Sequence, residues 1–286
     1  MRFRWDWLSP VVTAPYVPAL GPVHPDVVSA DLFAAVADVA GTGCFLPYDK
    51  DKRWADRKEE HVLVQEIVHR QGITVIPTLS TRGQMTLKIH YYSGHLPDLA
   101  EVAEWAHKWN STYGTRRGGR LIWLQETPDG ARTRLMLKTF TGHDEDPRPV
   151  LTLDECEHAD TFKAFAMQLG VDGFAFLHWR REAGLDDGPV LVVVEDHRIV
   201  GAIGPLSTML DATGRRQQPP QYFAVHPDYR HRGHGRALWR AAMGWGRRNG
   251  AAYKVLQAAV GSAAESLYVA EGVDTLGYVC MKELFS

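Results

Sequence analysis

The chain has 286 residues, of which 45% are hydrophobic and 23% charged, and its formal net charge is −2. This is the composition of an ordinary globular protein of about two domains. The near-neutral balance argues against a dedicated nucleic-acid binder, and no apolar run reaches the ~20 residues of a membrane helix. Three scattered cysteines suggest no disulfide framework, so we expect a cytoplasmic protein. Because no membrane helix is predicted, we also expect that it does not act at a membrane.

Residues 1–145 are predicted to form a small α/β domain of unknown role. Five prolines within residues 1–28 favour an extended arm, and the polar, proline-containing residues 142–149 are the candidate linker to the rest of the chain. Hydrophobic periodicity and turn residues predict the elements between them. These are helices over 29–39, from about 62 to 72 and over 96–109, and strands over 73–79, 86–92, 121–126 and 133–140.

Residues 146–286 are predicted to form the second domain, also α/β. A continuous apolar run at 190–194 is typical of a strand in the middle of a sheet. Ser262 and Glu265 have the spacing of a capping box, which begins a short helix. In chain order we expect strand 150–153, a helical region 154–169, strands 190–194, 199–203 and 222–225, a helix ending at 249–250, strand 253–260, the short helix, and the last strands within 273–284.

The stretch from Tyr222 to Gly250 is the most informative part of the sequence. It reads as a strand, a tight turn, a basic loop containing Gly233 and Gly235, and a helix. A helix start exposes unpaired backbone N–H groups and the positive end of the helix dipole, and glycine lets an anion approach them closely. Between Tyr229 and Ala264 there are seven lysines and arginines and no acidic residue. This pattern predicts a polyphosphate ligand.

The same residues carry a family resemblance. Arg230 to Gly235, with the sequence RHRGHG, fits the R/Q-x-x-G-x-G/A signature of the GCN5-related N-acetyltransferases (GNAT). The preceding Val225-His226-Pro227 is similar to the end of the fourth strand in that family. The resemblance covers about the last 140 residues. It implies a GNAT-type mixed sheet flanked by helices, preceded here by the smaller N-terminal α/β domain, and acetyl-CoA as co-substrate.

The resemblance also implies the residues of the site. The amine would attack the thioester of acetyl-CoA directly, and Tyr268, in the segment Ala264-Glu265-Ser266-Leu267-Tyr268, matches the family's general acid. Free N–H groups of Phe223, Ala224 and Val225 would pair with the pantetheine arm and the carbonyl oxygen. The diphosphate would lie on the loop formed by Arg230, His231, Arg232, Gly233, His234, Gly235 and Arg236.

Two departures from the family pattern concern the chemistry. Gly261 stands where the family often has Asn, seven residues before the tyrosine. Many members carry a Glu on the fourth strand as base, but residues 217–225 contain no acid. The base could be His226, Glu265 or a chain of water molecules. No histidine spacing matches a zinc motif, so we expect no metal.

We therefore expect a CoA-dependent N-acetyltransferase that acylates the amine of a small molecule, because a two-domain chain can enclose a pocket. A protein or peptide amine is the alternative acceptor. A second hypothesis is a non-catalytic acyl-CoA sensor. A third is that the N-terminal half is a degenerate copy of the same fold, although it lacks an R-x-x-G-x-G loop. The sequence favours no oligomeric state.

Overall fold

The chain forms two compact units, described here from a computed structural model. Unit 1 comprises Met1–Lys138, Leu210–Arg215 and Val255–Ser286, and unit 2 comprises Thr139–Met209 and Arg216–Lys254. The predicted domain boundary at residue 145 stays a prediction. The structure describes residues 15–16, 46–47, 60–70, 73–80, 85–93, 95–115, 117–141, 149–170, 173–185, 188–210 and 214–284.

Three predictions lie wholly or nearly wholly outside these described residues, namely the proline-rich arm apart from residues 15–16, the helix over 29–39 and the linker apart from residue 149. Among the residues that are described, no helix is long and apolar enough to cross a membrane.

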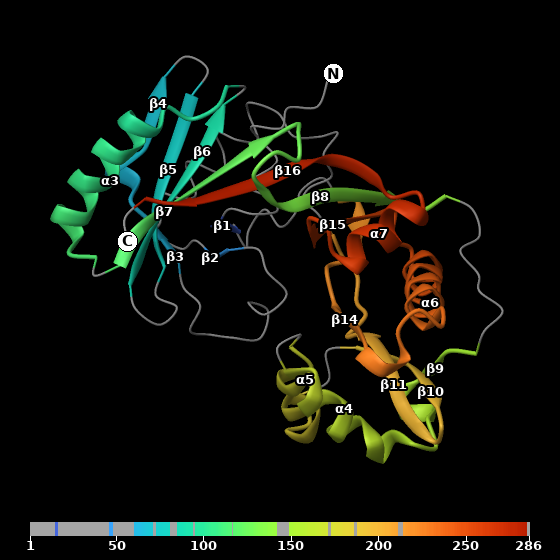
Figure 1. Ribbon diagram of the computed structural model, residues 1–286. Helices are drawn as coiled ribbons and strands as arrows, with labels where there is room; N and C mark the ends of the chain where they lie inside the picture. Colours follow the sequence, from blue (N-terminus) through green and yellow to red (C-terminus); the bar gives the residue numbers. More distant parts are fainter. Residues whose placement is uncertain are drawn as a thin grey trace. The chain divides into compact units, whose positions relative to one another are not determined.

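Unit 1 is built on a mixed sheet with the strand order β15-β8-β16-β7-β6-β5-β3, and β4 also pairs with β5 (Figure 1). β5 and β6 are antiparallel, whereas β6 and β7 are parallel and are connected through α3. The C-terminal strand β16 pairs antiparallel with both β7 and β8. The elements are β3 (Glu60–Val62), η3 (Val64–Glu66), β4 (Val68–Arg70), β5 (Ile73–Ser80), β6 (Thr86–Ser93), α3 (Leu99–Tyr113), β7 (Arg117–Gln125), β8 (Ala131–Thr139), β15 (Tyr253–Ala259), α7 (Ala263–Ala270) and β16 (Asp274–Glu283), while β1 (Pro15–Tyr16) pairs with β2 (Leu46–Pro47).

The helix predicted from about 62 to 72 is wrong. The structure has two short strands there, β3 and β4, separated by the 3-10 turn η3, and both strands pair antiparallel with β5. Valine and isoleucine are frequent in this segment, and β-branched side chains fit a pleated sheet better than a helix. The backbone groups of β5 find partners in these two strands, which outweighs the helical spacing.

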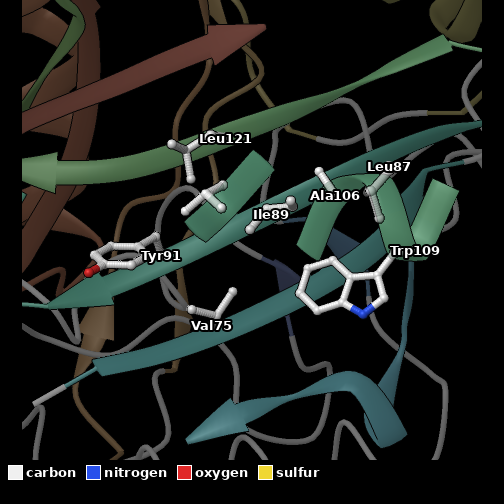
Figure 2. Packing of buried hydrophobic residues seen from close by; sticks show 8 residues of the cluster. Val75, Leu87, Ile89, Tyr91, Ala106, Trp109 and Leu121 are labelled. Carbon is white, nitrogen blue, oxygen red and sulfur yellow. The ribbon is translucent and has the colours of Figure 1, made fainter. Parts of the chain in front are cut away.

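The core of unit 1 lies between α3 and strands β5, β6 and β7, and Figure 2 shows its side chains. α3 begins at Asp98, whose Oδ1 accepts a hydrogen bond of 2.9 Å from Ala100 N, and it ends at Gly114 in the left-handed conformation. The buried cluster consists of Val75, Leu87, Ile89, Tyr91, Val102, Ala106, Trp109 and Leu121.

Trp109 anchors this core in two ways. Its ring is only 1% exposed, and its Nε1 donates a 2.7 Å hydrogen bond to Glu66 Oε2. Lys108 Nζ donates to the same oxygen at 2.9 Å, and these two hydrogen bonds lower the pKa of Glu66. One carboxylate therefore ties α3 to the 3-10 turn beside β5.

Unit 2 is an antiparallel sheet with the order β14-β11-β10-β9, covered by helices. Leu238 of α6 contacts the face of β11 at Gly201, whereas the Tyr222 ring of β14 contacts Gly173, at the start of α5. Because side chains alternate along a strand, α6 and α5 cover opposite faces. The elements are β9 (Leu151–Thr152), η4 (Leu153–Glu155), η5 (Ala159–Thr161), α4 (Phe162–Gln168), α5 (Phe174–Glu182), β10 (Leu191–Glu195), β11 (Arg198–Gly204), β12 (Met209–Leu210), β13 (Arg216–Gln217), β14 (Tyr222–Val225), η7 (Pro227–Tyr229) and α6 (His234–Arg248).

The single helical region predicted over 154–169 is only partly correct. The segment is two 3-10 turns followed by α4, with the chain extended at Cys156. Thr161 explains the late start of α4, since its Oγ1 accepts a 3.0 Å hydrogen bond from Ile199 N and so ties the segment to β11. Helix α5 was not predicted.

The path between β13 and β14 decides how unit 2 is organised. Gln217 pairs in parallel with Tyr253, and Gln218 N donates to Tyr253 O at 3.0 Å. Pro219 and Pro220 follow, and proline has no N–H with which to continue a ladder. The chain then enters β14, which pairs with β11 in the other sheet.

The Lys254 side chain lies where the hydrogen-bond ladder between β13 and β15 ends. It is 2% exposed, and its Nζ donates to Pro219 O at 2.7 Å and to Gln221 Oε1 at 2.5 Å. Burial in this setting lowers the pKa of Lys254 from 10.5 to about 7, because desolvation disfavours the charged ammonium.

We expect Trp109→Ala to lower the free energy of unfolding by about 3–5 kcal/mol, since it empties the centre of the unit 1 core and leaves Glu66 without its indole partner. The matched control is Trp179→Ala, because Trp179 is 63% exposed and its loss should change stability by no more than about 0.5 kcal/mol. Urea denaturation of the two variants is the measurement. Equal effects would contradict this description of the core.

Lys254→Met should change how stability depends on pH. Between pH 7 and 10.5 the unfolded chain holds a proton on Lys254 that the folded chain has lost, so wild-type stability rises with pH by up to about 1.4 kcal/mol per pH unit. Methionine removes this contribution, and the stability of the wild type relative to the variant should rise over that range. Urea denaturation at several pH values measures it, with the exposed Lys163→Met as control. Parallel stability curves for wild type and Lys254→Met would contradict the burial of the amine.

Candidate functional site

The loop before α6 has the backbone geometry of an anion site. His231 and Gly233 are left-handed, with φ of 62° and 84°, and Arg232 lies between them. Such alternation turns successive N–H groups to one side and forms a concave nest for an anion. No side-chain hydrogen bond caps α6 at Gly233, so the positive end of the helix dipole is open to a ligand. As predicted, Gly233 and Gly235 lie at the start of α6, Gly233 as its N-cap and Gly235 as its second residue.

Glu195, the last residue of β10, braces this loop. Glu195 Oε1 forms an ion pair with the Arg232 guanidinium, and Glu195 Oε2 lies 2.5 Å from His234 Nε2. Glu195 therefore neutralises part of the positive charge that the sequence places between Tyr229 and Ala264. What the loop offers an anion is chiefly its backbone N–H groups.

Tyr229 forms the second brace. Two guanidinium groups contact its ring, with Arg198 Cζ 4.9 Å and Arg232 Cζ 4.8 Å from the ring centroid. Its hydroxyl donates to Asp196 Oδ2 at 3.1 Å and accepts from Arg198 Nε at 3.1 Å. These two cation–π contacts and the hydroxyl hydrogen bonds fix the ring, so the loop is held to the β10–β11 hairpin.

β14 leaves one edge without a partner strand among the described residues. His226 N donates to Val200 O at 2.8 Å, and backbone groups alternate in direction along an antiparallel pair. The N–H groups of Phe223 and Val225 therefore point away from β11, while that of Ala224 points toward it. Two of the three predicted β14 donors thus face the edge. Val225 O already accepts a 3.2 Å hydrogen bond from Arg230 Nε.

Tyr268 lies on α7 in unit 1 and is 8% exposed. Burial raises its pKa above the ordinary value of 10.0, so the phenol keeps its proton at neutral pH. The predicted cap of α7 is present in part. Ser262 Oγ accepts from Glu265 N at 3.1 Å, but Glu265 Oε2 reaches back to Gly261 N, at 2.6 Å, one residue earlier than a capping box requires.

The two candidate bases both make structural contacts. Glu265 Oε1 is 3.3 Å from Arg134 Nη1, in addition to its hydrogen bond with Gly261. His226 Nδ1 accepts a 3.3 Å hydrogen bond from Asp228 N, which caps the 3-10 turn after β14. Gly261 has φ of 78°, a conformation that glycine and asparagine both adopt readily, which accounts for either residue at this position.

Three polar residues near the loop and β14 were missed in the sequence. Glu195 is a lone acid at a strand end, and only the fold brings it to Arg232. Gln221 and Lys254 meet across 33 residues. A lysine inside an apolar strand was the one available signal, because a buried amine requires local acceptors.

Among the described residues no group of three or more His, Cys, Asp or Glu side chains could hold a metal ion.

Comparison with known proteins agrees with this geometry. Residues 186–272 match the family profile described as "Acetyltransferase (GNAT) domain". The match contains β10, β11, β14, the loop and α6, which are the elements that build the candidate site. No curated protein matched the chain.

Solved structures share the fold at low identity. An acetyltransferase of the GNAT family from Colwellia psychrerythraea is 10% identical, with a TM-score of 0.52 over 90% of this chain and 97% of that one. A tandem GNAT protein from the clavulanic acid biosynthesis pathway is 13% identical, with a TM-score of 0.49 over 98% and 94%. The first of these shows likeness of fold alone. The match to the GNAT family profile covers residues 186–272, and it is this sequence match, rather than the solved structures, that indicates a GNAT domain there.

Proposed function

We propose that the chain is an N-acetyltransferase that moves an acetyl group from acetyl-CoA to an amine. The observation that carries the proposal is the uncapped, glycine-flanked start of α6, because its N–H groups and dipole suit a diphosphate. The acceptor we propose is the amine of a small molecule, as expected from the two-part organisation of the chain.

In this proposal the coenzyme is a substrate that brings an activated acyl thioester. The loop amides from His231 to Gly235 hold its diphosphate, and the braces on Tyr229 and Glu195 keep those amides in place before binding. The outward N–H groups of Phe223 and Val225 align the pantetheine arm along β14. Catalysis is then largely positioning, because a bound amine and thioester react as one unit.

Two proton transfers complete the reaction. Tyr268 is the group we assign to protonate the thiolate that leaves, since its phenol holds a proton at neutral pH. The attacking ammonium must lose a proton first. Glu265 is committed to Arg134 and to the start of α7, so His226 is the side chain we assign to this step.

Gly235→Asp tests the diphosphate site. Gly235 is the second residue of α6, where aspartate is compatible with a helix, but its carboxylate would take up the exposed N–H groups and repel a phosphate. We expect the Kd for acetyl-CoA to rise at least about tenfold in isothermal titration, a loss of about 1.4 kcal/mol.

The matched control is Gly130→Asp, at a turn of unit 1 with nothing within 4 Å of an added Cβ. Its φ of 68° is one that aspartate adopts more readily than most residues, and its Kd should equal that of the wild type. If wild-type protein fails to bind acetyl-CoA at millimolar concentration, the proposed function is wrong.

Tyr268→Phe tests the general acid. Losing a positioned proton donor should lower the turnover number about a hundredfold while the Kd for acetyl-CoA stays within about twofold. The measurement is thiol release across a panel of amines and peptides, with Tyr113→Phe as control. Binding of acetyl-CoA without thiol release for any acceptor would instead favour an acyl-CoA sensor.

A further inference from the structure

The residues just before β14 contain a buried polar group that the reaction proposed above does not use. Gln221 Nε2 is shielded from water, and it has no hydrogen-bond partner among the described residues. A buried unpaired donor costs about 1–3 kcal/mol. Such a group in a functional domain calls for an acceptor that arrives with a ligand or a bound water molecule.

The orientation of this amide is fixed by its neighbour. Lys254 Nζ lies 2.5 Å from Gln221 Oε1 and 2.7 Å from Pro219 O. A protonated Lys254 only donates hydrogen bonds, and the neutral amine still has one N–H for each of these two oxygens, so the amide oxygen faces Lys254 and the nitrogen faces away from it. Where Lys254 holds its proton, below about pH 7, its charge also polarises the amide and strengthens the two N–H groups as donors.

The position of Gln221 identifies the oxygen that these donors could serve. Gln221 directly precedes β14, at the end of the strand opposite the diphosphate loop. A strand rises about 3.3 Å per residue, so Gln221 is roughly 13 Å along the chain from Val225. An arm that leaves the loop and follows the β14 edge would bring its thioester, rather than its diphosphate, toward Gln221.

We propose that Gln221 donates a hydrogen bond from Nε2 to the carbonyl oxygen of the acetyl thioester, and that Lys254 is the positioning residue that fixes its amide. The inference rests on the proposed function. In the transition state that oxygen becomes negative as the C–N bond forms and the C–S bond begins to break. A positioned hydrogen-bond donor stabilises this charge more than it stabilises the bound thioester.

A purely structural role is the competing explanation. In that case Gln221 would serve only as an acceptor for Lys254, and a glutamate at position 221 would serve equally well. Gln221→Glu separates the two explanations, because it keeps an oxygen for Lys254 and removes both N–H donors. Gln221→Leu is the second variant, should the glutamate variant fail to fold.

The experiment uses the full chain and acetyl-CoA with carbon-13 at the carbonyl. Isotope-edited infrared spectra of the bound coenzyme report the carbonyl stretch, which a hydrogen bond shifts to lower wavenumber. We expect the band of Gln221→Glu or Gln221→Leu at higher wavenumber than that of the wild type. We also expect a loss of about fivefold in the preference for acetyl-CoA over CoA, measured as a ratio of Kd values in titrations, which is the share of one hydrogen bond.

Lys254→Met should displace the carbonyl band in the same direction, and the exposed Lys163→Met should leave it unchanged. A band that stays at the wild-type position in both Gln221 variants overturns the inference, although the coenzyme still binds. A band that moves in the Gln221 variants but not in Lys254→Met overturns the role of Lys254. A wild-type protein that does not bind acetyl-CoA overturns the proposed function, and this inference with it.

Discussion

The end of the ladder between β13 and β15 is the constraint on which the candidate site depends. A parallel pair that continued past Gln218 would use the N–H groups of β14 for β15. Pro219 and Pro220 have no N–H, and the chain turns from one sheet to the other at this point. The buried amine of Lys254 satisfies the carbonyl of Pro219. Two prolines and one lysine thus keep the β14 edge available for a ligand.

Unit 1 contains an internal contrast to this arrangement. There, too, an antiparallel strand pair leads into a 15-residue helix and a further strand, in the order β5, β6, α3, β7. However, β6 and β7 are paired in parallel from Thr86 and Arg117 to Tyr91 and Trp123, and Asp98 caps the start of α3. In unit 1 the strand edge that corresponds to β14 is therefore paired, and the helix start that corresponds to α6 is capped. The order of elements is similar in the two units, and the degenerate-copy hypothesis stays a prediction.

Sequence reasoning succeeded where the determining interactions are local. The start of α6 at Gly233 follows from neighbouring residues, because caps and left-handed turns depend on a few consecutive side chains. The helix predicted over 96–109 begins a few residues later, after its cap Asp98. It failed where a distant partner decides. The two strands that replace the predicted helix after residue 62 need β5, the brace on Arg232 needs Glu195 from another strand, and the role of Gln221 needs Lys254. None of these pairings leaves a periodic signal in the chain.

The braces and the buried lysine together suggest how stability is distributed in unit 2. Glu195 and Tyr229 both contact the Arg232 side chain. In the proposed function these contacts would form the cradle before acetyl-CoA arrives, so that little ordering entropy is lost on binding. Lys254 and Gln221 have the opposite effect. A desolvated amine and an unpaired amide both lower stability, and such strain is tolerated where it serves a ligand. The favourable contacts surround the diphosphate loop, and the unfavourable ones lie at the other end of β14, where the reacting carbonyl would be.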